Sequence, residues 1–143
     1  MIRITSIRRC RIAEYDDIYL IIRSTASLKH NSSGILRYAT QLADLSPSRR
    51  LFYANLDWEK RGEWNQEKFD KIYKPAFIDE LNNNPNAEKW LNKLEKDNKA
   101  GRKIALLCFC PNENLCHRTI IGDILRNKGC NVIFDRNIKY NNV

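Results

Sequence analysis

The sequence predicts one α/β domain over residues 1–143, a three-layer sandwich around a small, mostly parallel sheet of the Rossmann-like kind. The length fits a single domain. The run "DIYLIIRST" is continuously β-branched and aromatic, which is typical of a strand buried on both faces. Residues 102–135 read as strand, helix and strand, and such a C-terminal βαβ unit requires parallel strands.

The first third of the chain predicts two strands and then helices. Residues 1–9 alternate isoleucines loosely with polar residues, as a first strand does, and residues 17–25 are the second strand. The Ser, Asn and Gly content of residues 26–35 marks a loop. Apolar residues at helical spacing predict a helix over 35–45, and Ser46-Pro47 then resembles an N-cap followed by proline in the first turn.

The middle of the chain predicts helices. Residues 63–81 place six apolar side chains on one helical face: Phe69, Ile72, Tyr73, Ala76, Phe77 and Leu81. Pro75 within this pattern predicts a kink or two short helices. Residues 82–101 predict another helix, with Asn84 or Asn86 as N-cap and Gly101 past the end. The C-terminal unit follows, with strands at 102–109 and 130–135 and a helix at 116–129.

Composition indicates a globular, basic protein. Apolar residues make up 43% of the chain, and the net charge of +8 favours phosphate-bearing partners, either a small molecule or nucleic acid. The chain is rich in Lys, Asn and Ile, so a codon bias toward these residues is a competing explanation for part of that charge. No apolar run approaches the roughly 20 residues that cross a bilayer, and no secretory signal is evident. We therefore expect a cytoplasmic protein with no membrane partner and with five reduced cysteines.

The segment "IALLCFCPNENLCHRTIIGDIL" holds three of the five cysteines and one of the two histidines. In open parallel sheets, ligands bind beyond the carboxyl ends of strands, beside the N-termini of the following helices. Free N–H groups and the helix dipole favour an anion there. Arg23 and Arg118 follow the two most apolar strands, so both are predicted to hold an anion in one cleft. A surface pair between Arg118 and Glu113 is the competing interpretation.

A second interpretation makes Cys116 a nucleophile. A thiol at a helix N-terminus beside His117 and Arg118 has its thiolate form favoured. His117, with an ordinary pKa near 6.5, suits an acid or base. The spacing from Cys110 to Arg118 does not match a Cys-x5-Arg phosphate cradle. Because free cysteines are among the most buried residues, a purely structural role competes with catalysis.

A third interpretation is a metal site. Cys108, Cys110, Cys116 and His117 are enough donors for tetrahedral zinc. The spacing argues against it, because Cys108 and Cys110 flank a strand end and the adjacent Cys116 and His117 are expected to diverge. Cys108 is expected to point into the sheet as a core residue. The sequence therefore predicts no metal and no cofactor, with zinc ranked last.

The same segment resembles the signature of domain-of-unknown-function family 488. That signature is an apolar strand ending in Leu-Cys, a short polar loop, Cys-His-Arg and an apolar helix, and its places are taken by Cys108, Cys116, His117 and Arg118. "LADLSPSRRLF" and "EKFDKIYKPAFIDEL" are similar to the YeaO-like branch of the family. The resemblance implies a compact α/β domain and leaves the reaction unassigned.

The early strand also resembles the family. "IYLIIRST" is similar to its strand ending in Val-Arg-Ser, with Arg23 and Ser24 in register, although the usual Asp-Val-Arg is Ile-Ile-Arg here. The resemblance implies that Arg23 and the Cys-His-Arg turn share a pocket. Cys110 is an addition to the family pattern.

The leading hypothesis is an anion-binding cleft for a phosphate-bearing ligand, either a nucleotide or a nucleic-acid component. Its predicted ligand-binding residues are Arg23, Ser24, Cys108 and Arg118, and its candidate catalytic residues are Cys116 and His117. The alternatives are a non-catalytic basic module that binds nucleic acid, and a zinc-stabilised module.

Overall fold

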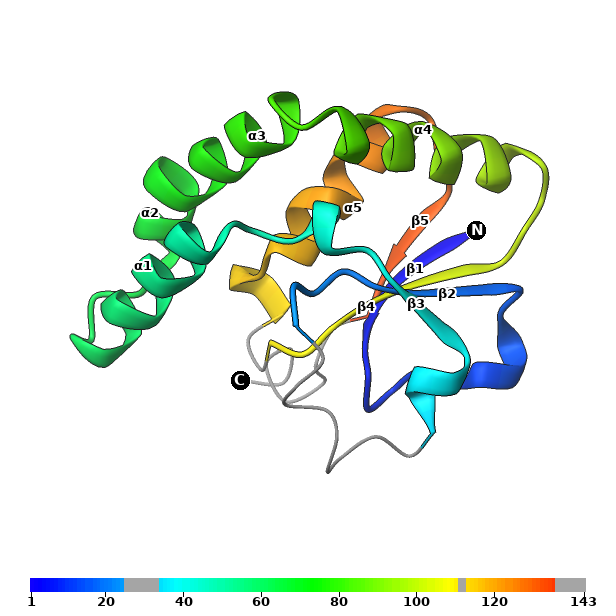
Figure 1. Cartoon of the computed structure of the whole chain (residues 1–143), viewed down its shortest axis with the longest axis horizontal. Coiled ribbons are helices and arrows are strands. Elements are labelled where there is room, and N and C mark those ends of the chain that lie inside the picture. Colours follow the sequence, from blue (N-terminus) through cyan, green and yellow to red (C-terminus); the bar gives the residue numbers. More distant parts are fainter. Residues whose placement is uncertain (25–33, 111–112, 136–143) are drawn as a thin grey trace.

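The computed structural model describes residues 1–24, 34–110 and 113–135 and contains a five-stranded, all-parallel sheet. The strands are β1 (Ile2–Ser6), β2 (Asp17–Leu20), β3 (Ala39–Gln41), β4 (Ile104–Cys108) and β5 (Val132–Phe134). Their order across the sheet is β3-β2-β4-β1-β5 (Figure 1). The predicted α/β sandwich with a parallel sheet is confirmed.

β4 lies in the middle of the sheet and pairs with β1 on one side and β2 on the other. All five of its residues are buried, as expected for a strand covered on both faces. β2 is shorter than the predicted strand, but the Ile21 N–H still donates to the Leu107 carbonyl at 2.9 Å. Thr25 and most of the predicted loop lie outside the described residues.

The helix predicted over residues 35–45 is wrong. The segment forms a 3-10 turn (Ile35–Arg37), then β3, then a second 3-10 turn (Ala43–Leu45). β3 pairs with β2 through the register Ile18↔Ala39 to Leu20↔Gln41. Pairing with a neighbouring strand thus overrides a short helical pattern, whose apolar ends are buried on either side of β3.

The helix predicted to open at Ser46-Pro47 begins later. Helix α1 spans Arg49–Lys60, and its N-cap is Ser48, whose hydroxyl accepts from the Leu51 N–H at 3.2 Å. The Ser46 hydroxyl instead donates to the Ala43 carbonyl at 2.5 Å. Ser46 therefore closes the preceding turn, and the helix start moves by two residues.

The interruption predicted at Pro75 is confirmed. Helix α2 (Gln66–Lys68) leads into a π-helical turn (Phe69–Tyr73) and then into α3 (Lys74–Asn82), where Pro75 occupies the first turn. Ile72 was predicted on the buried face, but it is 46% exposed. A π-turn adds a residue to the repeat, and this moves Ile72 off the apolar face.

The remaining helices follow the predicted plan. Helix α4 spans Pro85–Lys99 with Asn84 as N-cap, and α5 spans His117–Asn127. Helices α3, α4 and α5 contact one another, and α5 also contacts β1, β4 and β5 (Figure 1). These three helices therefore form one layer, which α5 joins to the sheet. No described helix combines the length and apolar character needed to span a bilayer.

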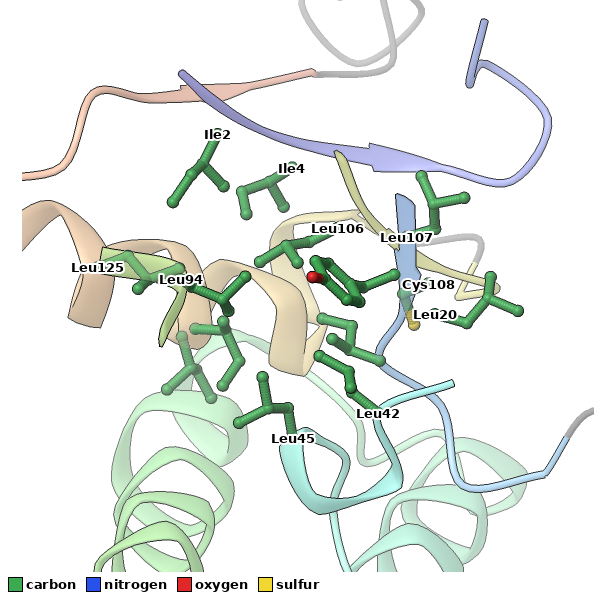
Figure 2. Close-up of a cluster of buried hydrophobic side chains, with 14 of the residues drawn as sticks. Ile2, Ile4, Leu20, Leu42, Leu45, Leu94, Leu106, Leu107, Cys108 and Leu125 are labelled. Carbon is green, nitrogen blue, oxygen red and sulfur yellow. The ribbon is translucent and has the colours of Figure 1, made fainter. Parts of the chain in front are cut away.

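The core lies between this layer and the sheet. Ile2 and Ile4 project from β1 toward Leu94 of α4 and Leu125 of α5 (Figure 2). All four are at most 2% exposed. This packing fixes α5 against β1 and so determines where the helix N-terminus lies relative to the end of β4.

Candidate metal centre

Four side chains with soft or borderline donor atoms meet where β4 ends and α5 begins. They are Cys108 at the last position of β4, Cys110 just beyond it, Cys116 at the N-cap of α5 and His117 at its first residue. The three Sγ atoms and a ring nitrogen all lie within 4.8 Å of one another. Cys108, Cys116 and His117 are buried, and Cys110 is partly buried.

The distances within the cluster suit a tetrahedral ion. Cys108 Sγ lies 3.5 Å from Cys110 Sγ and 3.4 Å from Cys116 Sγ. His117 Nδ1 lies 3.6 Å from Cys116 Sγ and 3.9 Å from Cys108 Sγ. With Zn–S near 2.3 Å and Zn–N near 2.0–2.1 Å, tetrahedral donors are separated by about 3.5–3.8 Å. The cluster has nearly that spacing before any ion is placed in it.

The histidine ring is fixed in the orientation that a metal ligand needs. His117 Nε2 lies 2.6 Å from the Ile21 carbonyl oxygen, so Nε2 carries the proton and donates it to this acceptor. The lone pair of Nδ1 then faces the sulfur atoms. The Phe77 ring packs edge-on against the imidazole, with centroids 5.7 Å apart. A hydrogen bond from the far ring nitrogen is the usual way in which proteins orient a ligating histidine.

The expectation that Cys116 and His117 diverge is wrong. Cys116 is the N-cap and has extended dihedrals (φ −125°, ψ 146°), whereas His117 is already helical. This change of backbone conformation turns two adjacent side chains to the same side. Cys108 is buried as predicted, but its Sγ contacts the cluster as well as the core.

Cys110, which the sequence brings forward only in the zinc interpretation ranked last, completes the four donors. The signal in the sequence is the number of soft donors between positions 108 and 117, whose irregular spacing is not that of a typical zinc site. The spacing of the donors in the sequence does not reveal the bend of the backbone after β4 or the extended conformation of the N-cap of α5. Pro111 and Asn112, within the same loop, lie outside the described residues, as does the side chain of Glu113.

The metal-free cluster favours one thiolate beside a protonated histidine. Burial acts to lower the pKa of His117, but the charge and hydrogen bonds of Cys108 and Cys110 raise it to about 10. Contacts with Cys110 and Cys116 hold the pKa of Cys108 well below its usual range. Burial raises the pKa of Cys116, and contact with Cys108 raises that of Cys110. A negative charge in the cluster is thus centred on Cys108.

Arg118 is buried at 1% exposure beside this cluster. Its guanidinium donates to the Thr5 carbonyl at 3.0 Å and to the Cys110 carbonyl at 2.8 Å. Arg23 is exposed, and its Nε donates to the Pro47 carbonyl at 2.9 Å. The two arginines therefore bind different parts of the backbone instead of facing one open cleft. Ser24 is exposed, and His30 lies outside the described residues.

Fold and site together define a parallel α/β protein with a Cys3His cluster at the carboxyl edge of its sheet. Residues 2–129 match the family model DUF488-N3a, described as the active DUF488-N3 subclade. The chain therefore belongs to the DUF488 family, and the predicted family resemblance is confirmed. The matched span contains all four donors. No curated protein and no solved structure matches the chain.

Proposed function

We propose that the protein binds one Zn²⁺ ion through Cys108, Cys110, Cys116 and His117, and that the ion stabilises the corner between β4 and α5. The observation that carries this proposal is the convergence of four donor atoms within 4.8 Å. Three thiolates and an imidazole at near-tetrahedral spacing favour zinc over harder ions such as Mg²⁺ or Ca²⁺, which prefer oxygen ligands.

The proposed role is structural. Catalytic zinc sites keep an open position for water or substrate, whereas structural sites use four protein ligands. Here all four positions are filled from the chain, and three of the four residues are buried. The ion would join the end of β4 to the first turn of α5. Through the hydrogen bond from His117 to Ile21, it would also fix the end of β2.

The test is metal analysis of the full-length chain purified under reducing conditions. We expect about one zinc per chain, which a strong chelator removes with a loss of thermal stability. Co²⁺ substitution should give the intense thiolate-to-cobalt absorption of a tetrahedral site. Cys110→Ser should lose both signals. Cys130→Ser, which changes a buried cysteine outside the cluster, should keep them. Metal-free wild-type protein that does not take up Zn²⁺ or Co²⁺ would refute the proposal.

A second candidate function is binding of a phosphate-bearing ligand, either a nucleotide or a nucleic-acid component, at the rim formed by Arg23 and Ser24. The net charge of +8 and the exposure of both residues beyond the carboxyl end of β2 favour this candidate. Catalysis by Cys116 and His117 belongs to the same candidate. It requires the cluster to be free of metal and to open, because both side chains are buried.

Binding of ATP and of a short oligonucleotide, each measured at low and at moderate salt, tests this candidate. We expect affinity to fall steeply with salt. Arg23→Gln should weaken binding by about tenfold, the loss expected for one charged hydrogen bond of about 1.5 kcal/mol. Arg50→Gln removes the same charge from an exposed position on α1 and should have a smaller effect. Equal effects of the two substitutions would indicate a diffuse charge effect instead of a site.

A further inference from the structure

We propose that Arg118 is a positioning residue for the metal centre: its guanidinium neutralises the net negative charge of the zinc–thiolate cluster and holds the ligand Cys110 in place. This inference rests on the proposed zinc function and adds an electrostatic partner to the four ligands.

The first observation is the burial of a charge that has no carboxylate partner among the side chains that the structure describes. Arg118 is among the largest fully buried side chains of the described structure, at 1% exposure. Its hydrogen-bond acceptors are two neutral backbone carbonyls, of Thr5 and Cys110. Its Nε is buried and has no acceptor within the described part of the chain. A buried charge is strongly unfavourable unless an opposite charge compensates it.

The second observation is the place of the guanidinium. Arg118 directly follows the ligand His117, and its terminal nitrogen lies 2.8 Å from the backbone oxygen of the ligand Cys110. The other terminal nitrogen binds Thr5 in β1, whose neighbour Ser6 is in register with Cys108. The guanidinium therefore links the end of β1 to the backbone of Cys110, the least buried of the four donors.

The charges of the proposed centre complement Arg118. Thiol ligands lose their protons when zinc binds, and the histidine binds as neutral imidazole. A divalent ion with three thiolates and one imidazole thus carries one net negative charge. The guanidinium carries one positive charge, so the buried assembly is neutral as a whole. Without the ion, the buried cluster no longer carries the net negative charge that balances the positive charge of the guanidinium.

A purely mechanical clamp is the competing explanation, since the guanidinium also joins two backbone carbonyls. Three variants separate charge from clamping. Arg118→Lys keeps the positive charge but loses the planar fork that reaches two acceptors. Arg118→Met keeps the length of the side chain and removes the charge. Arg126→Met is the matched control, because Arg126 is also on α5 and also donates to a backbone carbonyl, that of Val132, outside the cluster.

The measurement is zinc affinity by competition with a chromophoric chelator. We expect Arg118→Met to weaken zinc binding by about 10–100-fold, the usual effect of removing a partner from outside the ligand shell. Arg118→Lys should keep most of the affinity, and Arg126→Met should match wild type. Thermal unfolding should show that Arg118→Met costs the zinc-loaded protein more stability than the stripped protein. For Arg118→Lys, which keeps the charge but not the clamp, this difference should be smaller.

Two results would overturn the inference: zinc binding by Arg118→Met equal to wild type, or equal losses in Arg118→Met and Arg118→Lys. If Arg118→Met does not fold, Arg118→Gln replaces it, since Gln is neutral but keeps a hydrogen-bond donor. The outcome is also separable from the parent proposal. A wild-type chain that binds no zinc refutes the proposed function. If the wild-type protein binds zinc and the variants at position 118 bind it equally well, only the role of Arg118 is refuted.

Discussion

The ends of β4 and β2 lie side by side at the carboxyl edge of the sheet, where Leu20 is in register with Leu107, yet they differ in almost every property. Beyond β4 the chain turns inward and brings four donor side chains together under the start of α5. Beyond β2, Ile21 and Ile22 are still buried, but Arg23 and Ser24 are exposed. Position at the carboxyl edge therefore does not by itself define a ligand cleft, because the polar residues that follow a strand are buried in one case and exposed in the other.

The two arginines differ in the same way as the two strand ends. Both follow strongly apolar strands, and both donate to backbone carbonyls, but Arg118 is buried and Arg23 is exposed. Water screens the charge of Arg23, whereas Arg118 must find its compensation inside the protein. The closed corner and the open rim should therefore differ as strongly in energy as they do in geometry.

The largest effect is expected on removal of the metal from the closed corner. At free zinc about 1,000-fold above its Kd, binding contributes about 4 kcal/mol of stability. For a domain of this size that corresponds to a fall in Tm of roughly 10 °C after chelation. Differential scanning calorimetry of zinc-loaded and stripped protein measures it. A Tm that is unchanged by chelation would show that a metal does not stabilise the closed corner.

Truncation of the ring that backs the histidine should have an effect of similar size. Phe77 is fully buried and packs edge-on against His117. Phe77→Ala should cost about 3–5 kcal/mol in the free energy of unfolding and should also weaken metal binding, because the imidazole loses its support. Phe52→Ala, at a ring that is 47% exposed, should change stability by less than about 0.5 kcal/mol. Denaturant titration of both variants tests the prediction, and equal losses would contradict it.

A smaller effect is expected at the contact between α5 and β5. A Cβ on Gly122 would lie 2.4 Å from the Phe134 ring and 3.0 Å from Ile4. Gly122→Ala should therefore destabilise by about 1 kcal/mol, since overpacking of about 1–3 kcal/mol exceeds a helix-propensity gain of up to about 1 kcal/mol. Asp123→Ala, at the adjacent exposed position, is the control. A stabilised Gly122→Ala protein would show that the Phe134 ring moves aside freely.

The smallest effect is expected at the open rim. Arg23→Gln should change the free energy of unfolding by less than about 1 kcal/mol, because it removes hydrogen bonds that are partly exposed to water. The same substitution at Arg118 should cost clearly more in the zinc-loaded protein. Parallel urea titrations of the two variants measure these losses. Similar losses of unfolding free energy at positions 23 and 118 would show that rim and corner do not differ in energy.

The sequence predicted the C-terminal βαβ unit well because its signals agree. The apolar run of β4, the helical spacing of α5 and Gly129 after its end all indicate the same structure. Residues 35–45 were mispredicted because β3 has only three residues and depends on pairing with β2, which local periodicity does not encode. Tertiary contacts determine such short elements.

The candidate site was visible in the sequence as a set of donors but not as a geometry. Counting Cys and His between positions 108 and 117 gives the number of ligands. Whether they converge depends on the extended N-cap at Cys116 and on the bend that brings Cys110 back toward Cys108. The burial of Arg118 was likewise hidden, because an arginine in the first turn of a helix is ordinarily placed in solvent.

The place of β1 between β4 and β5 has a consequence for how the chain reaches this structure. Ile2 pairs with Ile104 on one side and is in register with Val132 on the other, so the first strand has no neighbour until the last third of the chain has been synthesised. Non-local parallel pairing of this kind slows folding, because a long loop must close before β1 can pair with β4 or β5. The isoleucines of β1 are therefore exposed on the nascent chain for most of its synthesis, and this is the period in which we expect it to be most prone to aggregation.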